Sequence, residues 1–272
     1  MKTVVITGIS GTLGSAMGKA YKSRGWQVVG VTRQPNLEGD FFDELCVSPQ
    51  ETIEDARKIF KYDPDVVILN AGQIETEVGE GGIPVVDLVE SMNRVNYSWP
   101  AVVGTEAAKL DRSKRLDVIA IGSIADGSPS CFGPVYHSGK IALHYFWSGV
   151  GPIVYHSSKN MIRLRLYRPG VIAGKFAWAP INRLNDKAYK IRENRVNSAP
   201  PADKVAETIV NWIDNSQEWV GTYDEPFGFK IFKYLFALFP NFFYRLQLYG
   251  WPKGSKFMLS LIHISEPTRP SQ

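Results

Sequence analysis

The stretch TVVITGISGTLGSAMGKAYKSRG, residues 3 to 25, decides the fold of this chain. It begins with Val4 to Thr7, a β-branched run that predicts a short strand. A glycine turn follows, and small and apolar residues then recur at helical spacing up to Gly25. A strand, a glycine turn and a helix in this order are typical of the opening of a parallel α/β sheet.

Three glycines, Gly8, Gly11 and Gly14, shape the turn. In the dinucleotide-binding motif, such glycines permit the tight turn, the close approach of a pyrophosphate to the backbone and the close packing of the helix. The helix N-terminus adds free N–H groups and the positive end of the helix dipole. We therefore predict a dinucleotide-binding turn here, and a glycine-rich turn without a ligand is the alternative.

The second expected strand, Trp26 to Val31, ends where the adenosine ribose of such a cofactor lies. An acidic residue at that point binds the 2′-hydroxyl of NAD, but this sequence has Thr32 and Arg33. Since an arginine suits the 2′-phosphate of NADP, we expect NADP(H) to be favoured over NAD(H). The alternative is an arginine that is solvated in a loop.

Strands and helices continue to alternate along the chain. The apolar run Val66 to Leu69 is typical of a strand that is buried on both faces of a parallel sheet. This alternation predicts a doubly wound parallel sheet of the Rossmann type, an α/β fold. The other expected elements are strands at 44–47 and 162–167 and helices at 50–61, 87–92, 99–109 and 201–213.

Residues 118 to 140, VIAIGSIADGSPSCFGPVYHSGK, carry the candidate chemistry. An apolar strand ends at Ser123, and Tyr136 and Lys140 stand four apart at the expected start of a helix, hence on one face. An ammonium within about 4 to 6 Å favours a phenolate and lowers the pKa of a tyrosine from about 10. The pair therefore suits acid/base chemistry, with Ser123 as a hydrogen-bond partner of the substrate oxygen. Taken alone, a Tyr four residues before a Lys is often accidental.

Together these motifs resemble those of the short-chain dehydrogenase/reductase family. The resemblance rests on TGISGTLG, LNAG, VNYSWP, GSIA, YHSGK and RPG, and it covers roughly residues 1 to 225. It implies a Rossmann-type sheet, a nicotinamide cofactor and hydride transfer to or from a carbonyl or secondary alcohol. It also implies a catalytic tetrad of Asn96, Ser123, Tyr136 and Lys140, in which Asn96 holds a water that links Lys140 to solvent.

The same resemblance assigns the cofactor contacts. They fall on the glycine turn, the end of the second strand, the LNAG motif, two members of the tetrad and the RPG motif, and no metal ligand is expected. The expected cofactor-binding residues are Thr7, Gly8, Ser10, Gly11, Leu13, Gly14, Arg33, Asn70, Ala71, Gly72, Tyr136, Lys140, Pro169 and Gly170.

A second pair, Tyr155 and Lys159, repeats the spacing of the first. The 13 residues from Ser123 to Tyr136 match the family pattern, and the 33 residues from Tyr136 to Pro169 leave room for a helix and a strand. Only 14 residues separate Tyr155 from Pro169. We therefore assign the chemistry to Tyr136 and expect Tyr155 at the far end of the segment that Tyr136 begins.

Several features depart from the family pattern. Cys46 stands where an aspartate near the adenine is expected, and Gly174 stands where a threonine often contacts the nicotinamide amide. Gly149, Gly151 and Pro152 are expected to break the helix that begins at the catalytic tyrosine, and that helix is often the family's dimer surface. The glycine spacing TGxxGxxG is that of the extended branch, which modifies nucleotide sugars.

The 272 residues carry 31 Lys and Arg against 27 Asp and Glu, a net charge of +4 that is too small to indicate a nucleic-acid partner. The two cysteines, Cys46 and Cys131, form no disulfide framework, and the chain opens on a strand rather than on a secretory signal, so a cytoplasmic protein is expected. Arg163 to Arg195 hold nine Lys or Arg against two acids. A solvated basic face is favoured there over a site for an anionic substrate group.

The composition changes near the end of the chain. We expect a catalytic domain at 1–225, an aromatic and basic extension at 226–259, and an artefactual or disordered tail at 260–272. Phe227 to Trp251 are rich in aromatic residues, and their longest uncharged run is too short to span a bilayer. A wall of a lipophilic pocket or a contact in a homo-oligomer is expected there, with peripheral contact to a membrane surface as the alternative. In each case a lipophilic substrate is favoured.

Three hypotheses for the function follow. The first is an NADP(H)-dependent oxidoreductase that acts on a carbonyl or secondary alcohol of a lipophilic molecule. The second is an epimerase or dehydratase of nucleotide sugars, which the glycine spacing suggests and the LNAG motif opposes. The third is a binding protein that senses NADP without turnover, which the intact tetrad opposes.

Overall fold

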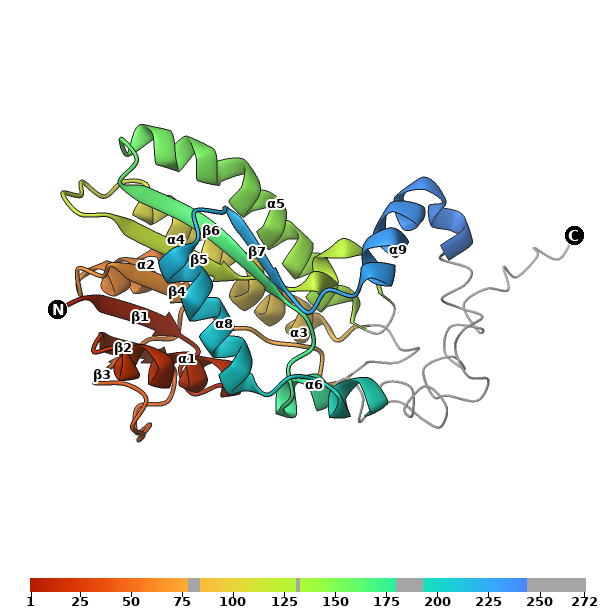
Figure 1. The fold of residues 1–272 in the computed structure, drawn as a ribbon, viewed down its shortest axis with the longest axis horizontal. Coiled ribbons are helices and arrows are strands. Elements are labelled where there is room, and N and C mark those ends of the chain that lie inside the picture. The colour runs from red at the N-terminus through yellow and green to blue at the C-terminus, as the bar shows by residue number, and fades with distance from the viewer. Residues whose placement is uncertain (78–83, 131–132, 180–192, 244–272) are drawn as a thin grey trace, which may run out of the picture.

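A computed structural model shows seven parallel strands in one sheet between two layers of helices (Figure 1). The structure describes residues 1–77, 84–130, 133–179 and 193–243. The tail at 260–272, the second half of the aromatic extension and part of the basic stretch lie outside the described residues. The predictions made for these segments therefore stay predictions.

The elements follow the alternation that the sequence predicts, so the Rossmann-type α/β fold is confirmed. The strands are β1 Thr3–Thr7, β2 Gln27–Thr32, β3 Glu44–Val47, β4 Val66–Leu69, β5 Leu116–Ile121, β6 Ile162–Pro169 and β7 Val220–Tyr223. The helices are α1 Thr12–Ser23, α2 Ile53–Phe60, α3 Val86–Asn93, η2 Arg94–Ser98, α4 Trp99–Ala107, η3 Ile124–Gly127, α5 Pro134–Ser157, α6 Lys175–Trp178, α8 Ala202–Asn215 and α9 Phe227–Leu238.

The strand order β3-β2-β1-β4-β5-β6-β7 places a switch point between β1 and β4. The chain runs outward from β1 to β3 and then crosses back to β4 on the other side of β1. In open parallel sheets, ligands bind outside the carboxyl ends of the strands at such a point. The fold therefore locates the candidate site beside the ends of β1 and β4.

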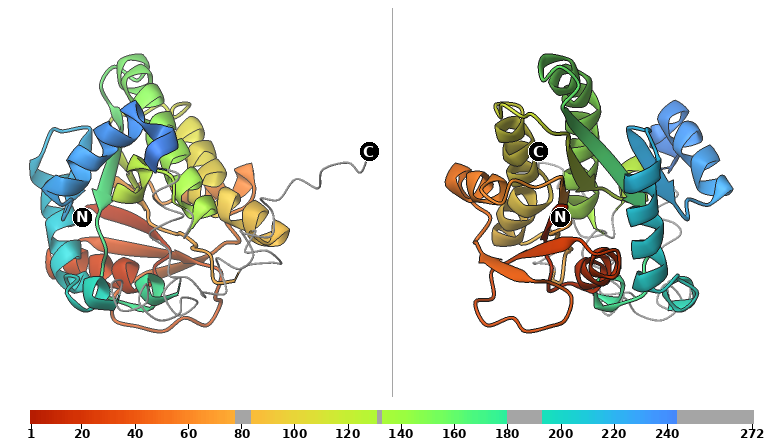
Figure 2. Two further views of the ribbon diagram at one scale, coloured as in Figure 1. Left: turned by 90° about the vertical axis from the view of Figure 1, so that its right-hand side faces the viewer. Right: turned by 60° about the vertical axis from the view of Figure 1, so that its left-hand side comes forward.

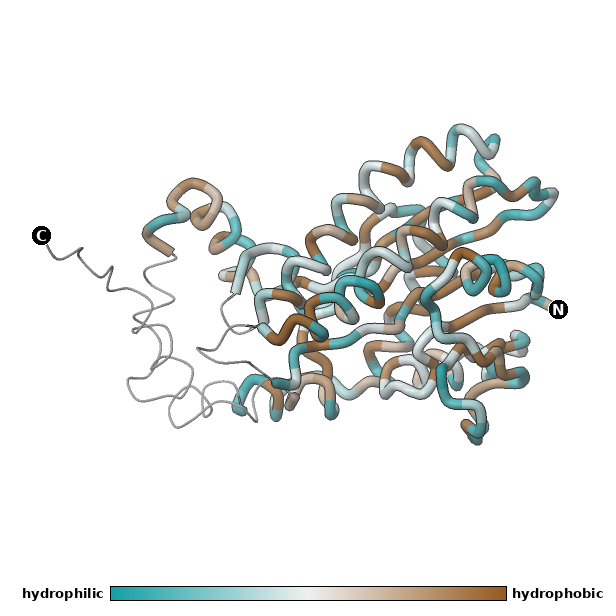
Figure 3. The backbone as a smooth tube through the Cα atoms, turned by 180° about the vertical axis from the view of Figure 1, so that it is seen from behind, coloured by the Kyte–Doolittle hydropathy of each residue, from teal (hydrophilic) through white to brown (hydrophobic). Residues whose placement is uncertain are grey.

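Each face of the sheet is covered by helices that bury apolar side chains. Met17 of α1 and Ile209 of α8 pack on one face with Ile6, whereas Val103 of α4 and Trp147 of α5 pack on the other. The two layers lie on opposite sides of the sheet in Figure 2. Figure 3 shows hydrophobic residues concentrated on the strands between them, as expected for a parallel sheet buried on both faces.

The expected break in the catalytic helix is wrong. Helix α5 continues through Gly149, Gly151 and Pro152 to Ser157. Pro152 is exposed, so the backbone group that loses its hydrogen bond there lies near solvent. Gly151 lets the helix approach β6, because an added Cβ would lie 3.0 Å from the Leu164 carbonyl oxygen. The burial of the helix on the sheet outweighs the local preference to end it.

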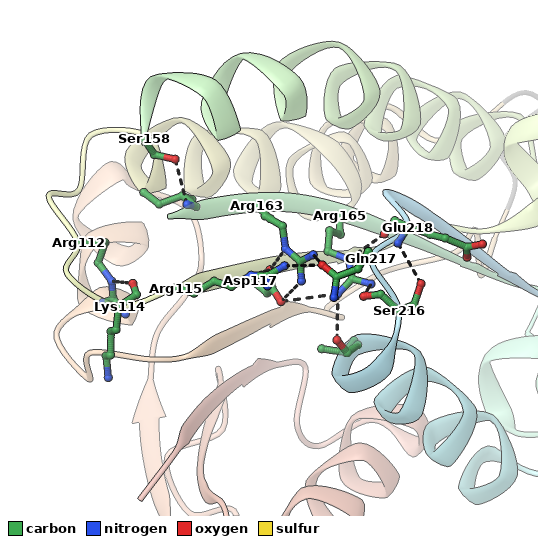
Figure 4. Close-up of polar contacts among 12 residues, drawn as sticks. Arg112, Lys114, Arg115, Asp117, Ser158, Arg163, Arg165, Ser216, Gln217 and Glu218 are labelled. Carbon is green, nitrogen blue, oxygen red and sulfur yellow. Dashed lines mark hydrogen bonds and ion pairs between the residues drawn. The ribbon is translucent and has the colours of Figure 1, made fainter. Parts of the chain in front are cut away.

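The expected solvated basic face is also wrong for the part of the stretch that forms β6. Arg163 donates two hydrogen bonds of 2.6 Å to the Asp117 carboxylate, and both side chains are buried (Figure 4). Arg165 is fully buried, lies 3.9 Å from the ring centre of Trp212, and donates to the backbone carbonyl of Ile213 at 3.0 Å. These arginines connect the end of α8 to the amino ends of the strands, whereas the candidate site lies at their carboxyl ends.

Asp117→Ala should lower the free energy of unfolding by about 3 to 5 kcal/mol, because it leaves the buried Arg163 without its partner. Asp40→Ala is the matched control, since Asp40 is 81% exposed in its ion pair with Lys19 and should change stability little. Chemical denaturation of both variants measures the difference. Equal stability of the two variants would contradict this role of Asp117.

Candidate active site

The glycine turn lies at the switch point in the predicted geometry. Gly8 has a φ of +64°, and its N–H donates to the Val31 carbonyl of β2 at 3.0 Å. A Cβ at Gly8 would lie 2.8 Å from Ala71 Cα, and one at Gly14 would lie 2.2 Å from the Gly8 carbonyl oxygen. The backbone conformation at Gly8 and the space at Gly14 therefore require glycine.

Two side chains tie this turn to the LNAG motif. Thr7 Oγ1 accepts hydrogen bonds from the amides of Asn70 and Ala71, both at 3.0 Å. In return, Asn70 Nδ2 donates to the carbonyls of Thr7 and Gly8 at 3.2 Å. Thr7 is fully buried, so its hydroxyl serves this connection. We call the four contacts the β1–β4 clamp. The sequence predicts these residues as cofactor contacts, and the structure adds that they hold the two loops together.

The start of α1 fits the pyrophosphate of a dinucleotide. Gly11 is the N-cap and makes no side-chain capping bond, so the first N–H groups of the helix have no side-chain acceptor at the cap. No acidic residue lies in the first turn, and Ser10 and Gly11 are exposed, with Leu13 half-buried beside them. A helix N-terminus of this kind attracts an anion. The described residues thus suit the predicted nicotinamide dinucleotide.

Arg33 follows the carboxyl end of β2 and is exposed. Val31, two residues earlier, pairs with Thr7 of β1, so Arg33 lies on the side of the glycine turn where the adenosine ribose is expected. Cys46 is buried on the neighbouring strand β3. These positions agree with the sequence analysis, but they do not by themselves distinguish NADP from NAD.

Ser123 and Tyr136 come together at the carboxyl end of β5. Ser123 is buried, follows the strand and caps η3, where its hydroxyl accepts a hydrogen bond from the Ala125 amide at 3.1 Å. The same hydroxyl lies close enough to the Tyr136 phenol to act on the pKa of that phenol. Tyr136 lies in the first turn of α5, whereas Tyr155 lies at the far end of that helix, as predicted. The structure thus pairs the chosen tyrosine with the chosen serine.

Lys140 lies one turn after Tyr136 and is buried. Its Nζ donates to the Ile121 carbonyl at 2.8 Å and lies 5.7 Å from the centre of the Tyr136 ring. Burial lowers the pKa of Lys140 to about 8, and the negative charge of Asp126 acts in the opposite direction.

The expectation that Lys140 lowers the pKa of Tyr136 is not met in this structure. Burial raises the pKa of Tyr136 to about 12, and the negative charges of Asp126 and Glu75 add to this rise. The Ser123 hydroxyl beside the phenol acts in the opposite direction. Burial and the two negative charges together outweigh the effect of Ser123, and the phenol is protonated at neutral pH.

Asn96 lies in the π-helical turn η2 and is buried. Its side chain binds the Gln73 backbone, since Oδ1 accepts from the Gln73 amide at 2.9 Å and Nδ2 donates to the Gln73 carbonyl at 2.8 Å. A Cβ at Gly72 would lie 3.3 Å from Asn96 Oδ1 and 3.9 Å from Lys140 Nζ, so these three positions are neighbours. The structure assigns the amide of Asn96 to holding the segment after LNAG, and the predicted water stays a prediction.

The RPG motif lies at the carboxyl end of β6. Pro169 ends β6, and the Gly170 N–H donates to the Tyr223 carbonyl of β7 at 2.8 Å. Gly170 must be small because an added Cβ would lie 2.7 Å from the Asp224 carbonyl oxygen. Gly174 lies opposite the glycine turn, where its Cβ would be 3.4 Å from Thr12 Oγ1.

A buried charged pair next to Ser123 was not predicted from the sequence. Arg168 forms two hydrogen bonds, of 2.6 and 2.5 Å, to the carboxylate of Asp126, and His144 Nδ1 lies 2.7 Å from the same carboxylate. The pair joins the end of β6 to η3. The available signals were a charged residue three positions after Ser123 and an arginine inside an apolar strand.

The described residues contain neither a cluster of metal ligands nor a membrane-spanning helix. No group of three or more His, Cys, Asp or Glu in these residues is placed to hold a metal ion. No described helix is long and apolar enough to cross a membrane.

Comparisons with known proteins find a family match near the start of the chain and solved structures with a similar fold. Residues 4–82 match the model of the NAD dependent epimerase/dehydratase family. The ligand-free aldohexose dehydrogenase of Thermoplasma acidophilum has a similar structure, with a TM-score of 0.65 and 15% identity over 82% of this chain and 92% of that one. The chain has the fold of the short-chain dehydrogenase/reductase family.

A second structure with this fold is a short-chain dehydrogenase from Streptomyces avermitilis, with a TM-score of 0.63 and 18% identity over 88% of this chain and 94% of that one. No curated protein sequence matches the chain. The predicted resemblance to short-chain dehydrogenase/reductase proteins is therefore confirmed through the fold and through the family match of residues 4–82, which contain the glycine turn.

Proposed function

We propose that the chain is an NADP(H)-dependent oxidoreductase that interconverts a carbonyl and a secondary alcohol in a lipophilic substrate. The observation that carries this proposal is the placement of the Tyr136 phenol beside the Ser123 hydroxyl, with Lys140 one turn further along α5. These side chains lie at the carboxyl end of the sheet, near the switch point where a nicotinamide cofactor is expected.

A bound nicotinamide would supply or accept the hydride. In the direction of reduction, Tyr136 is protonated at neutral pH and donates its proton to the substrate oxygen. Ser123 holds that oxygen by a hydrogen bond. Lys140, whose pKa of about 8 keeps it largely charged at neutral pH, favours the phenolate that remains after the proton has left. In oxidation the same groups work in reverse.

Tyr136→Phe should lower the turnover rate by roughly 10² to 10⁴, the usual contribution of a placed general acid, and weaken cofactor binding far less, because the other expected cofactor contacts stay in place. Tyr155→Phe is the matched control, because Tyr155 lies on the same helix and contacts Trp219 instead. Steady-state rates and cofactor titrations of both variants test the assignment. A Tyr136→Phe variant with the wild-type rate would exclude this residue as the acid and favour a protein that only binds the cofactor.

The preference for NADP(H) rests on Arg33, an exposed cation beyond β2 with no acidic residue before it at the strand end. Within the described residues no hydrogen bond or ion pair engages its guanidinium. It is therefore available for a 2′-phosphate.

Arg33→Ala should weaken NADPH binding at least tenfold and leave NADH binding nearly unchanged, because only NADPH carries the 2′-phosphate. Titration of each cofactor, followed by its fluorescence, measures both affinities. Lys61→Ala serves as the control, since Lys61 is exposed and lies between the end of α2 and the amino end of β4, whereas Arg33 follows the carboxyl end of β2. Equal losses for NADPH and NADH would remove Arg33 from the account.

The lipophilic character of the substrate rests on α9. This helix projects beyond the carboxyl side of the sheet (Figure 1) and presents Phe227, Tyr234 and Leu238, each at least 70% exposed. Lys233 of α9 forms an ion pair with Glu225 and lies 3.9 Å from Asp126, so the helix stands next to the turn that carries Ser123. An apolar surface beside the reacting groups suits a lipophilic molecule.

The second candidate is an epimerase or dehydratase of nucleotide sugars. The match of residues 4–82 to the NAD dependent epimerase/dehydratase family favours it. The aromatic helix beside the site opposes it. Turnover of a nucleotide sugar without net change in free cofactor would establish this second function, whereas net oxidation of NADPH by a lipophilic ketone would establish the first.

A further inference from the structure

We propose that Glu75 is a positioning residue, which holds the first turn of α5 and thereby places the Tyr136 phenol. Glu75 Oε1 accepts hydrogen bonds from the backbone N–H groups of Val135 and Tyr136, at 2.7 and 3.2 Å. Glu75 is 2% exposed. The inference deepens the proposed function and rests on it, because the role of Glu75 is defined by that of Tyr136.

Helix α5 needs this acceptor because its own N-terminus lacks one. Its N-cap is Gly133, which has no side chain to bond the first amides, and Pro134 at the first helical position has no N–H. The next two donors are those of Val135 and Tyr136, and Glu75 accepts both. A carboxylate at a helix N-terminus is also favoured by the helix dipole. Glu75 thus caps the N-terminus of α5, although it lies 60 residues before Val135 in the sequence.

Glu75 is itself held by the tetrad. The Gln73 backbone, two residues before it, makes both of its hydrogen bonds to the Asn96 side chain. The short segment from Gln73 to Glu75 therefore joins Asn96 to the backbone of Tyr136. The Glu75 side chain packs closely against Gly133, since a Cβ at Gly133 would lie 3.2 Å from Glu75 Oε2.

The negative charge of the Glu75 carboxylate also acts on the Tyr136 phenol. Glu75 Oε2 is buried and has no hydrogen-bond partner within the described residues. The charged and polar groups that face the Tyr136 phenol or ring are Glu75, Asp126 of η3, Ser123, and Lys140 on its own helix. The charge of Glu75 contributes to the raised pKa of Tyr136, after burial and together with Asp126.

Glu75→Gln separates the two effects, since it keeps the acceptor oxygen and removes the charge. We expect this variant to retain turnover within about threefold and to ionise Tyr136 at lower pH than the wild type, because removal of a nearby negative charge favours the phenolate. Glu75→Ala removes the acceptor as well, and turnover should fall by roughly 10²-fold as the phenol is displaced. Glu77→Gln is the control, an exposed glutamate of the same segment.

The ionisation is followed by NMR of the full chain labelled with ¹³C at the tyrosine ring carbon that carries the oxygen, from about pH 9 to about pH 13, a range that includes both the ordinary tyrosine pKa and the raised pKa of about 12 of Tyr136. The Tyr136 signal is assigned by its loss in Tyr136→Phe. An unchanged Tyr136 titration in Glu75→Gln would overturn the inference, even if Glu75→Ala fails to fold. The titration needs no turnover, so an inactive wild type would refute the proposed function, and the titration of Glu75→Gln would still decide whether the Glu75 carboxylate acts on the phenol.

Discussion

The β1–β4 clamp is the interaction on which the rest of the site depends. Four hydrogen bonds of 3.0 to 3.2 Å join Thr7 and Gly8 to Asn70 and Ala71, at the point where the order of the strands reverses. The loops after β1 and β4 would otherwise be separate connections. The clamp fixes the glycine turn against the LNAG segment. It therefore places both the start of α1 and the residues that lead to the expected tetrad.

The backbone leads from Asn70 of the clamp to Gln73, and from there hydrogen bonds connect it to the helix of the proposed proton donor, Tyr136. Asn96 holds the backbone of Gln73, and Glu75 then accepts the first amides of α5, which carries Tyr136. From the other side, the Asp126–Arg168 pair holds the turn after Ser123 against β6. Two sets of contacts, which begin on different strands, thus hold the Tyr136 phenol and the Ser123 hydroxyl in place. Proton transfer requires such precise placement.

The sequence predicts the sheet, the glycine turn and the Ser123 to Tyr136 pairing, because each depends on patterns within about 25 residues or on a family motif. It misses Glu75 and the Asp126–Arg168 pair, whose partners lie 42 to 61 residues apart along the chain. It errs at Pro152, where burial of α5 on the sheet outweighs the local signal. It errs again at Tyr136, because spacing reveals that a lysine is near but not how deeply the phenol is buried.

The transfer of deuterium from NADPH labelled at the reactive carbon of its nicotinamide tests the central claim most directly. The full chain is incubated with this cofactor and a set of lipophilic ketones, and the products are analysed by mass spectrometry. The account predicts an alcohol that carries one deuterium at the former carbonyl carbon, with the oxygen protonated from the enzyme and finally from solvent. If the chain binds the cofactor and no ketone acquires deuterium, while a nucleotide sugar is converted, the oxidoreductase account is contradicted.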